Sequence, residues 1–245
     1  NLRFHQAEYD NQANFSRSLA SLGDVYINDA FSVSHRAQAS ISAIKKHIPA
    51  YAGLLLEQEI KALTKVIRPR KPLVVILGGA KISTKAPLIQ RLYKNSRKVL
   101  IGGGLANNFF KQAGLEIGKS LYDADSQAVV KRLLKNKLLA AKLVLPLDVF
   151  VKRRGRALLV KPEQVKPGDY ILDIGPETIK LFSTYIKSAK TILWNGPLGK
   201  FEEKSFRSGT LSVGSLVAAR SSGSAYGVVG GGETVAALEL TGLAA

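Results

Sequence analysis

From residue 72 onward, short apolar runs alternate with segments of helical periodicity. The predicted strands are Leu73–Leu77, Val99–Ile101, Lys142–Leu145, Tyr170–Ile174, Thr191–Trp194 and Ala225–Val229. After most of them, apolar side chains recur every three or four residues, which is typical of amphipathic helices. Apolar strands that alternate with helices indicate a parallel sheet covered by helices on both faces. The sequence therefore predicts an α/β fold with a doubly wound, Rossmann-like sheet.

Five of the predicted strands run into glycine-rich loops. These loops contain Gly78-Gly79, Gly102-Gly103-Gly104, Gly175-Pro176, Gly196–Gly199 and Gly230-Gly231-Gly232. In a parallel sheet the carboxyl ends of the strands lie on one edge, where ligands bind. Glycine lets backbone N–H groups approach a phosphate, and the N-terminus of a following helix favours an anion. The pattern predicts a nucleotide-type ligand at this edge.

The first 70 residues are organised differently. Val25–Ile27 predicts a short strand, and the apolar periodicity from Tyr51 to Ile67 predicts a long helix that Pro69 and Pro72 end. The pattern leaves two interpretations of this helix open, a connection between two domains or one more crossover helix.

Composition restricts the class of protein. Of the 245 residues, 46% are hydrophobic and 22% are charged, which is typical of a globular protein. No apolar stretch approaches the roughly 18 residues of a membrane span, and no secretory signal is visible. Cysteine is absent, which excludes disulfides and thiolate metal sites. Methionine is absent too, so we expect a processed chain or a fragment, from a cytoplasmic enzyme without a membrane partner.

The net charge of +18 raises the question of a polyanionic partner. The excess is concentrated in residues 51–100 and 151–200, and the densest run is Lys152-Arg153-Arg154-Gly155-Arg156, which predicts a hairpin tip. No aromatic side chains interleave with the basic clusters, as single-strand nucleic-acid binders usually require. We therefore favour a solvated basic face over a nucleic-acid interface.

Two lysines stand beside the first glycine-rich loop. Lys81 and Lys85 are four residues apart, so they lie on the same face of the helix that follows. Two cations next to bare backbone suit an oligophosphate. In so lysine-rich a chain, ordinary surface lysines are the open alternative.

Two later loops combine glycine with a carboxylate. Asn195 and Pro197 follow the only tryptophan, and Glu202 is placed to accept hydrogen bonds from ribose hydroxyls. Glu233 and Thr234 follow three glycines at a helix start, which suits a magnesium-bound phosphate. The alternatives are a glutamate that complements the helix dipole and a plain N-terminal cap.

Two glycine motifs fail the tests for known phosphate loops. Gly114–Ser120 has three residues between its glycines where the Walker A motif has four, and it follows a helix instead of a strand. Gly102–Gly104 lacks the third glycine of the dinucleotide fingerprint, because Asn107 occupies that position.

The order of the motifs resembles one enzyme family. The elements are Asn1–Phe4, Asn28–Phe31 with His35-Arg36-Ala37, Gly78–Lys81 with Lys85, Ile101–Gly104, Leu145-Pro146 with Asp148, Asp173–Pro176, Trp194–Pro197 with Phe201-Glu202, Gly209-Thr210, and Gly230–Thr234. This series resembles phosphoglycerate kinase from Asn1 to Ala245. The Trp-Asn-Gly-Pro and His-Arg-Ala elements are specific to that family.

The resemblance implies two α/β domains joined by a long helix. Residues 1–50 would be the remainder of the 3-phosphoglycerate domain, 51–70 the interdomain helix and 71–245 the domain for magnesium ADP or ATP. The implied reaction is reversible phosphoryl transfer between 1,3-bisphosphoglycerate and ADP, giving 3-phosphoglycerate and ATP. These small molecules are the expected partners of a monomer. In the family the first domain begins upstream and a terminal segment follows, so we expect this chain alone to bind nucleotide and turn over poorly.

The resemblance also assigns roles to residues. Lys81, Gly231 and Gly232 resemble the catalytic positions, and Arg3 and Arg36 resemble ligands of the substrate phosphate. The implied nucleotide-binding set is Gly78, Gly79, Lys85, Gly103, Gly104, Asn195, Pro197, Glu202, Gly231, Gly232, Glu233 and Thr234. Glu233 stands where the family usually has aspartate as the magnesium ligand, and its extra methylene can still reach a metal. The alternatives are a nucleotide-binding module without turnover and a basic nucleic-acid-binding protein on the same fold.

Overall fold

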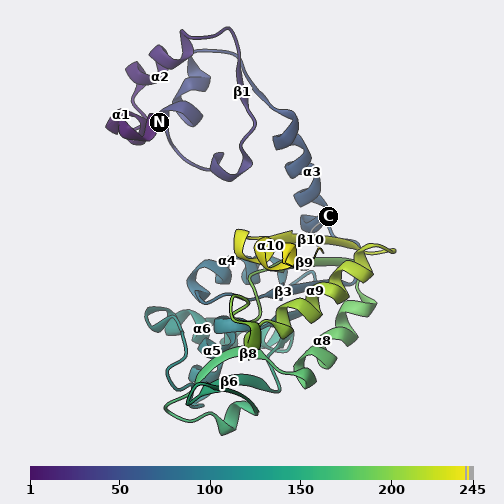
Figure 1. Cartoon of the computed structure of the whole chain (residues 1–245). Helices are drawn as coiled ribbons and strands as arrows, with labels where there is room; N and C mark the ends of the chain where they lie inside the picture. Colours follow the sequence, from purple (N-terminus) through teal and green to yellow (C-terminus); the bar gives the residue numbers. More distant parts are fainter. Residues whose placement is uncertain (241, 243–245) are drawn as a thin grey trace. The chain divides into compact units, whose positions relative to one another are not determined.

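The computed structural model describes residues 1–240 and 242, and the chain divides into two compact units (Figure 1). The units are Asn1–Lys65 and Val66–Ala245, so the boundary between them lies within helix α3 (Leu54–Ile67). The helix was predicted to begin at Tyr51, but Tyr51 lies in strand β2 (Ala50–Ala52). Residues 50–52 pair with β1 instead, and in the first turn of the helix the Asp29 carboxylate accepts a hydrogen bond from the Leu56 amide at 2.9 Å.

The first unit is made of short elements. In chain order these are η1 (Leu2–Phe4), α1 (Gln6–Tyr9), α2 (Ala13–Ala20), β1 (Tyr26–Asn28), η2 (Phe31–Val33), η3 (Ala39–Ala43), η4 (Ile44–Lys46) and β2. Strands β1 and β2 pair in parallel, with Ile27 opposite Tyr51. The buried Glu8 carboxylate accepts hydrogen bonds from the Ser40 amide at 3.0 Å and the Ser40 hydroxyl at 2.6 Å, which ties α1 to η3.

The second unit is built on a parallel sheet of five strands. Their order is β10 (Tyr226–Gly230), β9 (Thr191–Asn195), β3 (Leu73–Leu77), β4 (Ser96–Ile101) and β5 (Leu143–Val144). All residues of β3 are buried, as expected for a central strand of apolar residues. Leu77 pairs with both Ile101 and Asn195, so the carboxyl ends of β4, β3 and β9 are level at one edge.

Helices cover both faces of this sheet, which confirms the doubly wound prediction (Figure 1). One core joins β3 and β4 to α4 (Ile82–Leu92), α5 (Gly103–Gln112) and α6 (Gln127–Lys135). The other joins β3 and β9 to α8 (Pro176–Ser188), α9 (Ser208–Ser221) and α10 (Gly232–Glu239), around the buried Trp194. The remaining short helices are η5 (Ala124–Ser126), α7 (Lys137–Ala140), η6 (Pro162–Gln164) and η7 (Lys204–Phe206). Within residues 1–240 and 242, no helix is long and apolar enough to cross a membrane.

A second, antiparallel sheet corrects one part of the sequence prediction. Its order is β7 (Arg156–Val160), β6 (Val149–Arg153) and β8 (Tyr170–Ile174). The chain turns at Arg154 and Gly155, both at positive φ, so β7 folds back on β6, and β8 then pairs antiparallel with the other side of β6. The strand at 170–174 was correctly predicted, but Gly175-Pro176 is not on the carboxyl edge of the parallel sheet. Four glycine-rich loops lie on that edge, not five.

Candidate functional site

Two adjoining cavities lie at the carboxyl edge of the parallel sheet. The first, of about 350 Å³, is lined by the ends of β3 and β9 and the starts of α4 and α10. The second, of about 290 Å³, is lined by the start of α5, strand β8 and the loop after β9. Gly79, Ala80 and Glu233 line both cavities, so the two form one continuous site.

The backbone of neighbouring loops builds the floor of the site. The amide of Gly78 donates to the carbonyl of Asn195 at 3.0 Å, and the amide of Gly79 donates to the carbonyl of Pro197 at 2.9 Å. A Cβ atom at Gly78 would lie 2.0 Å from the Pro197 carbonyl oxygen, so no other residue fits there. The Gly-Gly sequence after β3 therefore lets two strand-end loops lie in contact.

Lys81 and Lys85 both line the first cavity, as the helical spacing predicted. Lys81 is exposed at the N-cap of α4, and Lys85 is half-buried one turn further on. The Lys85 ammonium donates to the side-chain oxygen of Asn195. Burial lowers the pKa of Lys85, and the nearby carboxylate of Glu233 opposes that effect. The first cavity thus presents two amine groups to an anion.

The start of α10 completes the first cavity. Gly231 has a positive φ of 94°, and the Thr234 hydroxyl accepts a hydrogen bond from the Gly196 amide at 2.7 Å. The buried Thr234 therefore joins the loop after β9 to α10, while Gly231, Gly232 and Glu233 are exposed. Bare backbone at a helix start, next to two lysines, is suited to binding phosphate groups.

The second cavity is lined by residues from several segments of the chain. Gly103, Gly104, Pro197 and Glu202, four of the predicted nucleotide-binding residues, lie here. Its other walls include Asn107, Ser120, Leu121 and Tyr170–Leu172, which sequence reasoning missed. No local motif marks those residues, because they come from stretches far apart in the chain.

The remaining predicted residues lie elsewhere. Arg3 is exposed and Arg36 is half-buried, and both belong to the first unit, so their proposed role in substrate binding stays a prediction. Among the described residues, no group of three or more His, Cys, Asp or Glu is placed to hold a metal ion. Glu233 is a single carboxylate, which fits the mode in which Mg²⁺ binds one or two carboxylates, water and substrate phosphates.

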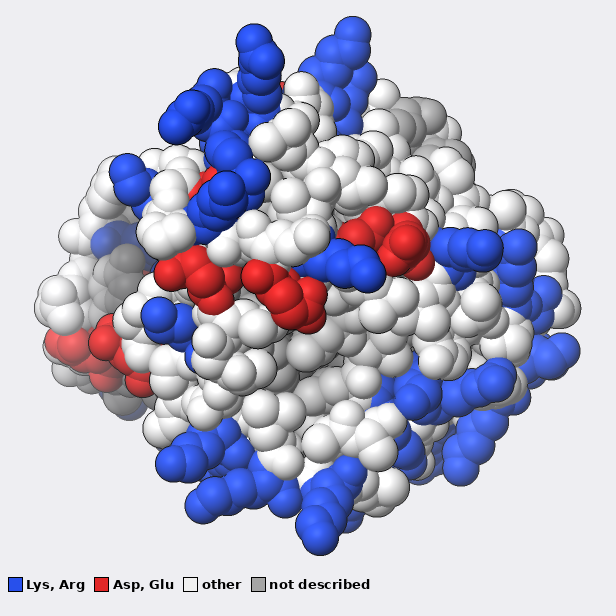
Figure 2. Space-filling model, turned by 90° about the horizontal axis from the view of Figure 1, so that it is seen from below, with Lys and Arg blue, Asp and Glu red and all other residues white. Residues whose placement is uncertain are grey.

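The basic run lies at the tip of the β6–β7 hairpin, as predicted, and part of its charge is paired with carboxylates. Lys152 pairs with Glu203 at 3.0 Å, and Arg153 pairs with the buried Asp169 at 2.6 Å. Arg154 and Arg156 are exposed. On the face shown in Figure 2, Lys and Arg side chains stand in separate groups with acidic side chains between some of them. On this face the basic side chains do not form a continuous stripe of the kind that binds a nucleic acid backbone.

Comparison with known proteins gives a consistent result. The family model for phosphoglycerate kinase matches residues 1–245. The chain is 43% identical to phosphoglycerate kinases of Wolbachia sp. subsp. Drosophila simulans, over 253 residues, and of Francisella tularensis subsp. tularensis, over 250 residues. Each alignment covers 99% of this chain and 63% of the relative, so the chain spans about 63% of the length of these curated proteins.

Solved structures agree with the sequence matches. The phosphoglycerate kinase of Coxiella burnetii superposes with a TM-score of 0.87 and 36% identity, over 99% of this chain and 64% of that one. The enzyme of Pyrococcus horikoshii superposes with a TM-score of 0.79 and 27% identity, over 98% of this chain and 63% of that one. The glycine-rich edge with its two lysines thus lies in a chain whose sequence and fold match this family over nearly all of residues 1–245, and the chain belongs to the phosphoglycerate kinase family.

Proposed function

We propose that this chain binds magnesium ADP or ATP in the two adjoining cavities. The proposal rests on the different groups that line the two cavities. Lys81, Lys85 and exposed glycine backbone line the first cavity, and Glu202 lines the second. The first suits the phosphates and the second suits the ribose and base. Glu233, which lines both, would hold the metal at the phosphates.

The reaction in which we propose this chain takes part is phosphoryl transfer between 1,3-bisphosphoglycerate and ADP. In the reverse direction the acceptor is the carboxylate of 3-phosphoglycerate, which is ionised near neutral pH and needs no general base. Lys81 and the backbone of Gly231 and Gly232 would stabilise the charge on the transferring group. Arg3 and Arg36 would bind the phosphate of the phosphoglycerate. We retain the expectation of a cytoplasmic monomer that acts on small molecules.

The nucleotide part of the proposal is tested by calorimetric titration of this chain with ADP, with and without Mg²⁺. We expect saturable binding to one site that Mg²⁺ strengthens, and absence of binding would contradict the proposal. A coupled assay then follows ATP formation from 1,3-bisphosphoglycerate and ADP. Binding without turnover would favour the alternative of a nucleotide-binding module.

A nucleic-acid role is tested in the same preparation. Lys152 and Arg153 are already paired with carboxylates, so their charges are less available to a nucleic acid backbone. A fluorescent single-stranded oligonucleotide would be titrated at low and at moderate salt, with ADP as competitor. We expect weak binding that moderate salt abolishes and ADP does not displace, as for a nonspecific basic surface. Salt-resistant binding that ADP displaces would place a nucleic acid in the site.

A further inference from the structure

The ion pair between Arg153 and Asp169 lies outside both cavities. The Arg153 guanidinium donates from Nε to Asp169 Oδ1 at 2.7 Å and from Nη2 to Asp169 Oδ2 at 2.6 Å. The Asp169 side chain is 1% exposed, and its carboxylate also accepts from the Lys166 amide at 2.8 Å. Such a two-pronged, charge-assisted pair is strong and has a defined geometry. Arg153 therefore sets the position of the turn that leads into β8.

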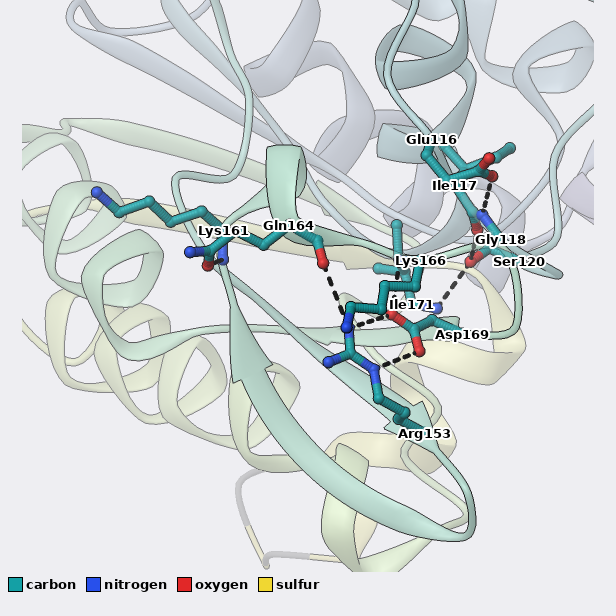
Figure 3. A network of polar contacts seen from close by, with 10 residues as sticks. All are labelled: Glu116, Ile117, Gly118, Ser120, Arg153, Lys161, Gln164, Lys166, Asp169 and Ile171. Carbon is teal, nitrogen blue, oxygen red and sulfur yellow. Dashed lines mark hydrogen bonds and ion pairs between the residues drawn. The ribbon is translucent and has the colours of Figure 1, made fainter.

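The backbone beside Asp169 holds a second segment, residues 116–120 (Figure 3). The carbonyl of Asp169 accepts from the Lys119 amide at 2.7 Å, and the Ser120 hydroxyl oxygen accepts from the Ile171 amide at 2.7 Å. Gly118 has a positive φ of 59°, and a Cβ there would lie 2.2 Å from the Asp169 carbonyl oxygen. The two segments are thus in close backbone contact, as Figure 3 shows.

These segments continue directly into the second cavity. Ser120, Leu121 and residues 170–172 form one of its walls. The carbonyl of Leu172 then accepts from the Lys200 amide at 2.7 Å, which holds the turn that carries Glu202. Lys152, the neighbour of Arg153, holds the same turn through Glu203. None of these residues lines the first cavity.

We propose that Arg153 is a positioning residue for the nucleoside half of the site. Through Asp169 it holds the wall of the second cavity against α5, and Lys152 supports the neighbouring turn through Glu203. The pair therefore sets the affinity for base and ribose and leaves the affinity for phosphate groups unchanged. This inference rests on the proposed nucleotide-binding function. Under this proposal, residues 152 and 153 of the basic run have a structural role that the charge of the run alone did not indicate.

The test compares two ligands, ADP and inorganic pyrophosphate, which reports on the first cavity alone. Dissociation constants for both are measured by calorimetry for the wild-type chain, Arg153→Gln and the matched control Arg156→Gln, whose side chain is exposed in the same hairpin. We expect Arg153→Gln to weaken ADP binding about tenfold, because a wall that is correctly placed only about a tenth of the time lowers the apparent affinity by that factor. Pyrophosphate binding should change less than about twofold, and Arg156→Gln should change neither constant.

Other results would overturn the inference. Unchanged ADP binding by Arg153→Gln, or equal weakening of both ligands, would show that the pair has no selective role. If Arg156→Gln weakened ADP binding as much as Arg153→Gln does, the loss of affinity would come from the lower positive charge of the hairpin and not from the pair with Asp169. If Arg153→Gln does not fold, Arg153→Lys keeps the charge but loses the two-pronged geometry, and a selective loss of ADP affinity is still required of it. A wild-type chain that does not bind ADP would contradict the proposed function itself, and the inference with it.

Discussion

The two cavities of the site are built by different means. The first lies at the ends of parallel strands, where Gly78 and Gly79 bond directly to the loop after β9, and it combines glycine backbone with the side chains of Lys81 and Lys85. The second is walled by side chains from stretches far apart in sequence, which the pair of Arg153 and Asp169 helps to hold. Phosphate groups bind to N–H groups and cations, and the loops at the carboxyl edge of a parallel sheet bring both together. A nucleoside needs a shaped wall, and here the shape depends on bonds behind the cavity.

Two buried carboxylates near the ends of β8 differ in the direction of their pKa shift. The pKa of Asp169 is lowered by its hydrogen bonds from Arg153, so this group is stable as an anion. Burial raises the pKa of Asp173 to about 7, although the amides of Gly209 and Ile174 oppose that effect. Asp173 contacts the N-terminus of α9 and leaves room only for glycine at position 199, which lines the second cavity.

The largest predicted effect comes from Asp173, whose ionisation should lower the stability of the folded protein as the pH rises. The folded-state pKa of about 7 lies above the unfolded value of 3.8, so folding is favoured while Asp173 is protonated and loses that contribution between about pH 4 and pH 7. The change amounts to roughly 4 kcal/mol, since one pKa unit corresponds to about 1.4 kcal/mol. Denaturant unfolding at a series of pH values gives the free energy of unfolding of the wild type and of Asp173→Asn. Between pH 4 and pH 7 this free energy should fall less steeply with pH in the variant.

Asp169→Asn provides the matched comparison with opposite sign. Its carboxyl has a lowered pKa, so its contribution is present above the unfolded pKa near 4 and is lost as the pH falls through the folded value. The variant should therefore lose stability mainly above pH 4, relative to the wild type. If Asp173→Asn leaves the slope between pH 4 and pH 7 unchanged, Asp173 is not the group that titrates.

The next effect is a steric one at the first cavity. Gly78→Ala places a methyl group 2.0 Å from the Pro197 carbonyl oxygen, which must separate the two loops. We expect a destabilisation of about 3 kcal/mol, as for an overpacked core, and loss of both ADP and pyrophosphate binding. Thermal unfolding and calorimetry measure the two effects. Gly223→Ala is the control, because a Cβ there meets its nearest atom at 3.6 Å, and wild-type-like behaviour of Gly78→Ala would contradict the backbone account of the first cavity.

Most of the first cavity could be predicted from the sequence, but of the second cavity only the glycine-rich loops with Pro197, Glu202 and Glu233. The run Leu73–Leu77 matches β3 residue for residue, and the spacing of Lys81 and Lys85 places both on one side of α4, because each signal is local. The wall at Ser120 and Ile171 joins residues 51 positions apart through one hydrogen bond. No pattern within either stretch indicates that pairing. The carboxylate partners of the basic run were missed for the same reason, since Asp169 and Glu203 are not adjacent to it in sequence.

A charge change at the first cavity should affect both ligands alike. Lys85→Met removes the half-buried ammonium that bonds to Asn195, with little change in side-chain length. Hydrogen bonds to charged groups contribute about 1.5–3 kcal/mol, so ADP and pyrophosphate should both bind about ten- to a hundredfold more weakly. Calorimetry measures both constants, and Lys94→Met, at an exposed position on the same unit, serves as the control. A loss confined to ADP would mean that Lys85 does not contact the phosphates.

The smallest predicted effect separates the cavities most cleanly. Glu202 is exposed at the second cavity, and Glu202→Gln keeps its shape while it weakens hydrogen bonds accepted from ribose hydroxyls. Exposed charged contacts contribute little, so we expect ADP to bind about threefold more weakly. Pyrophosphate, which has no ribose, should bind as it does to the wild type. Glu163→Gln, an exposed glutamate outside both cavities, controls for net charge. If Glu202→Gln instead strengthened pyrophosphate binding, Glu202 would act by repelling phosphate, and the division into a phosphate end and a nucleoside end would be wrong at this residue.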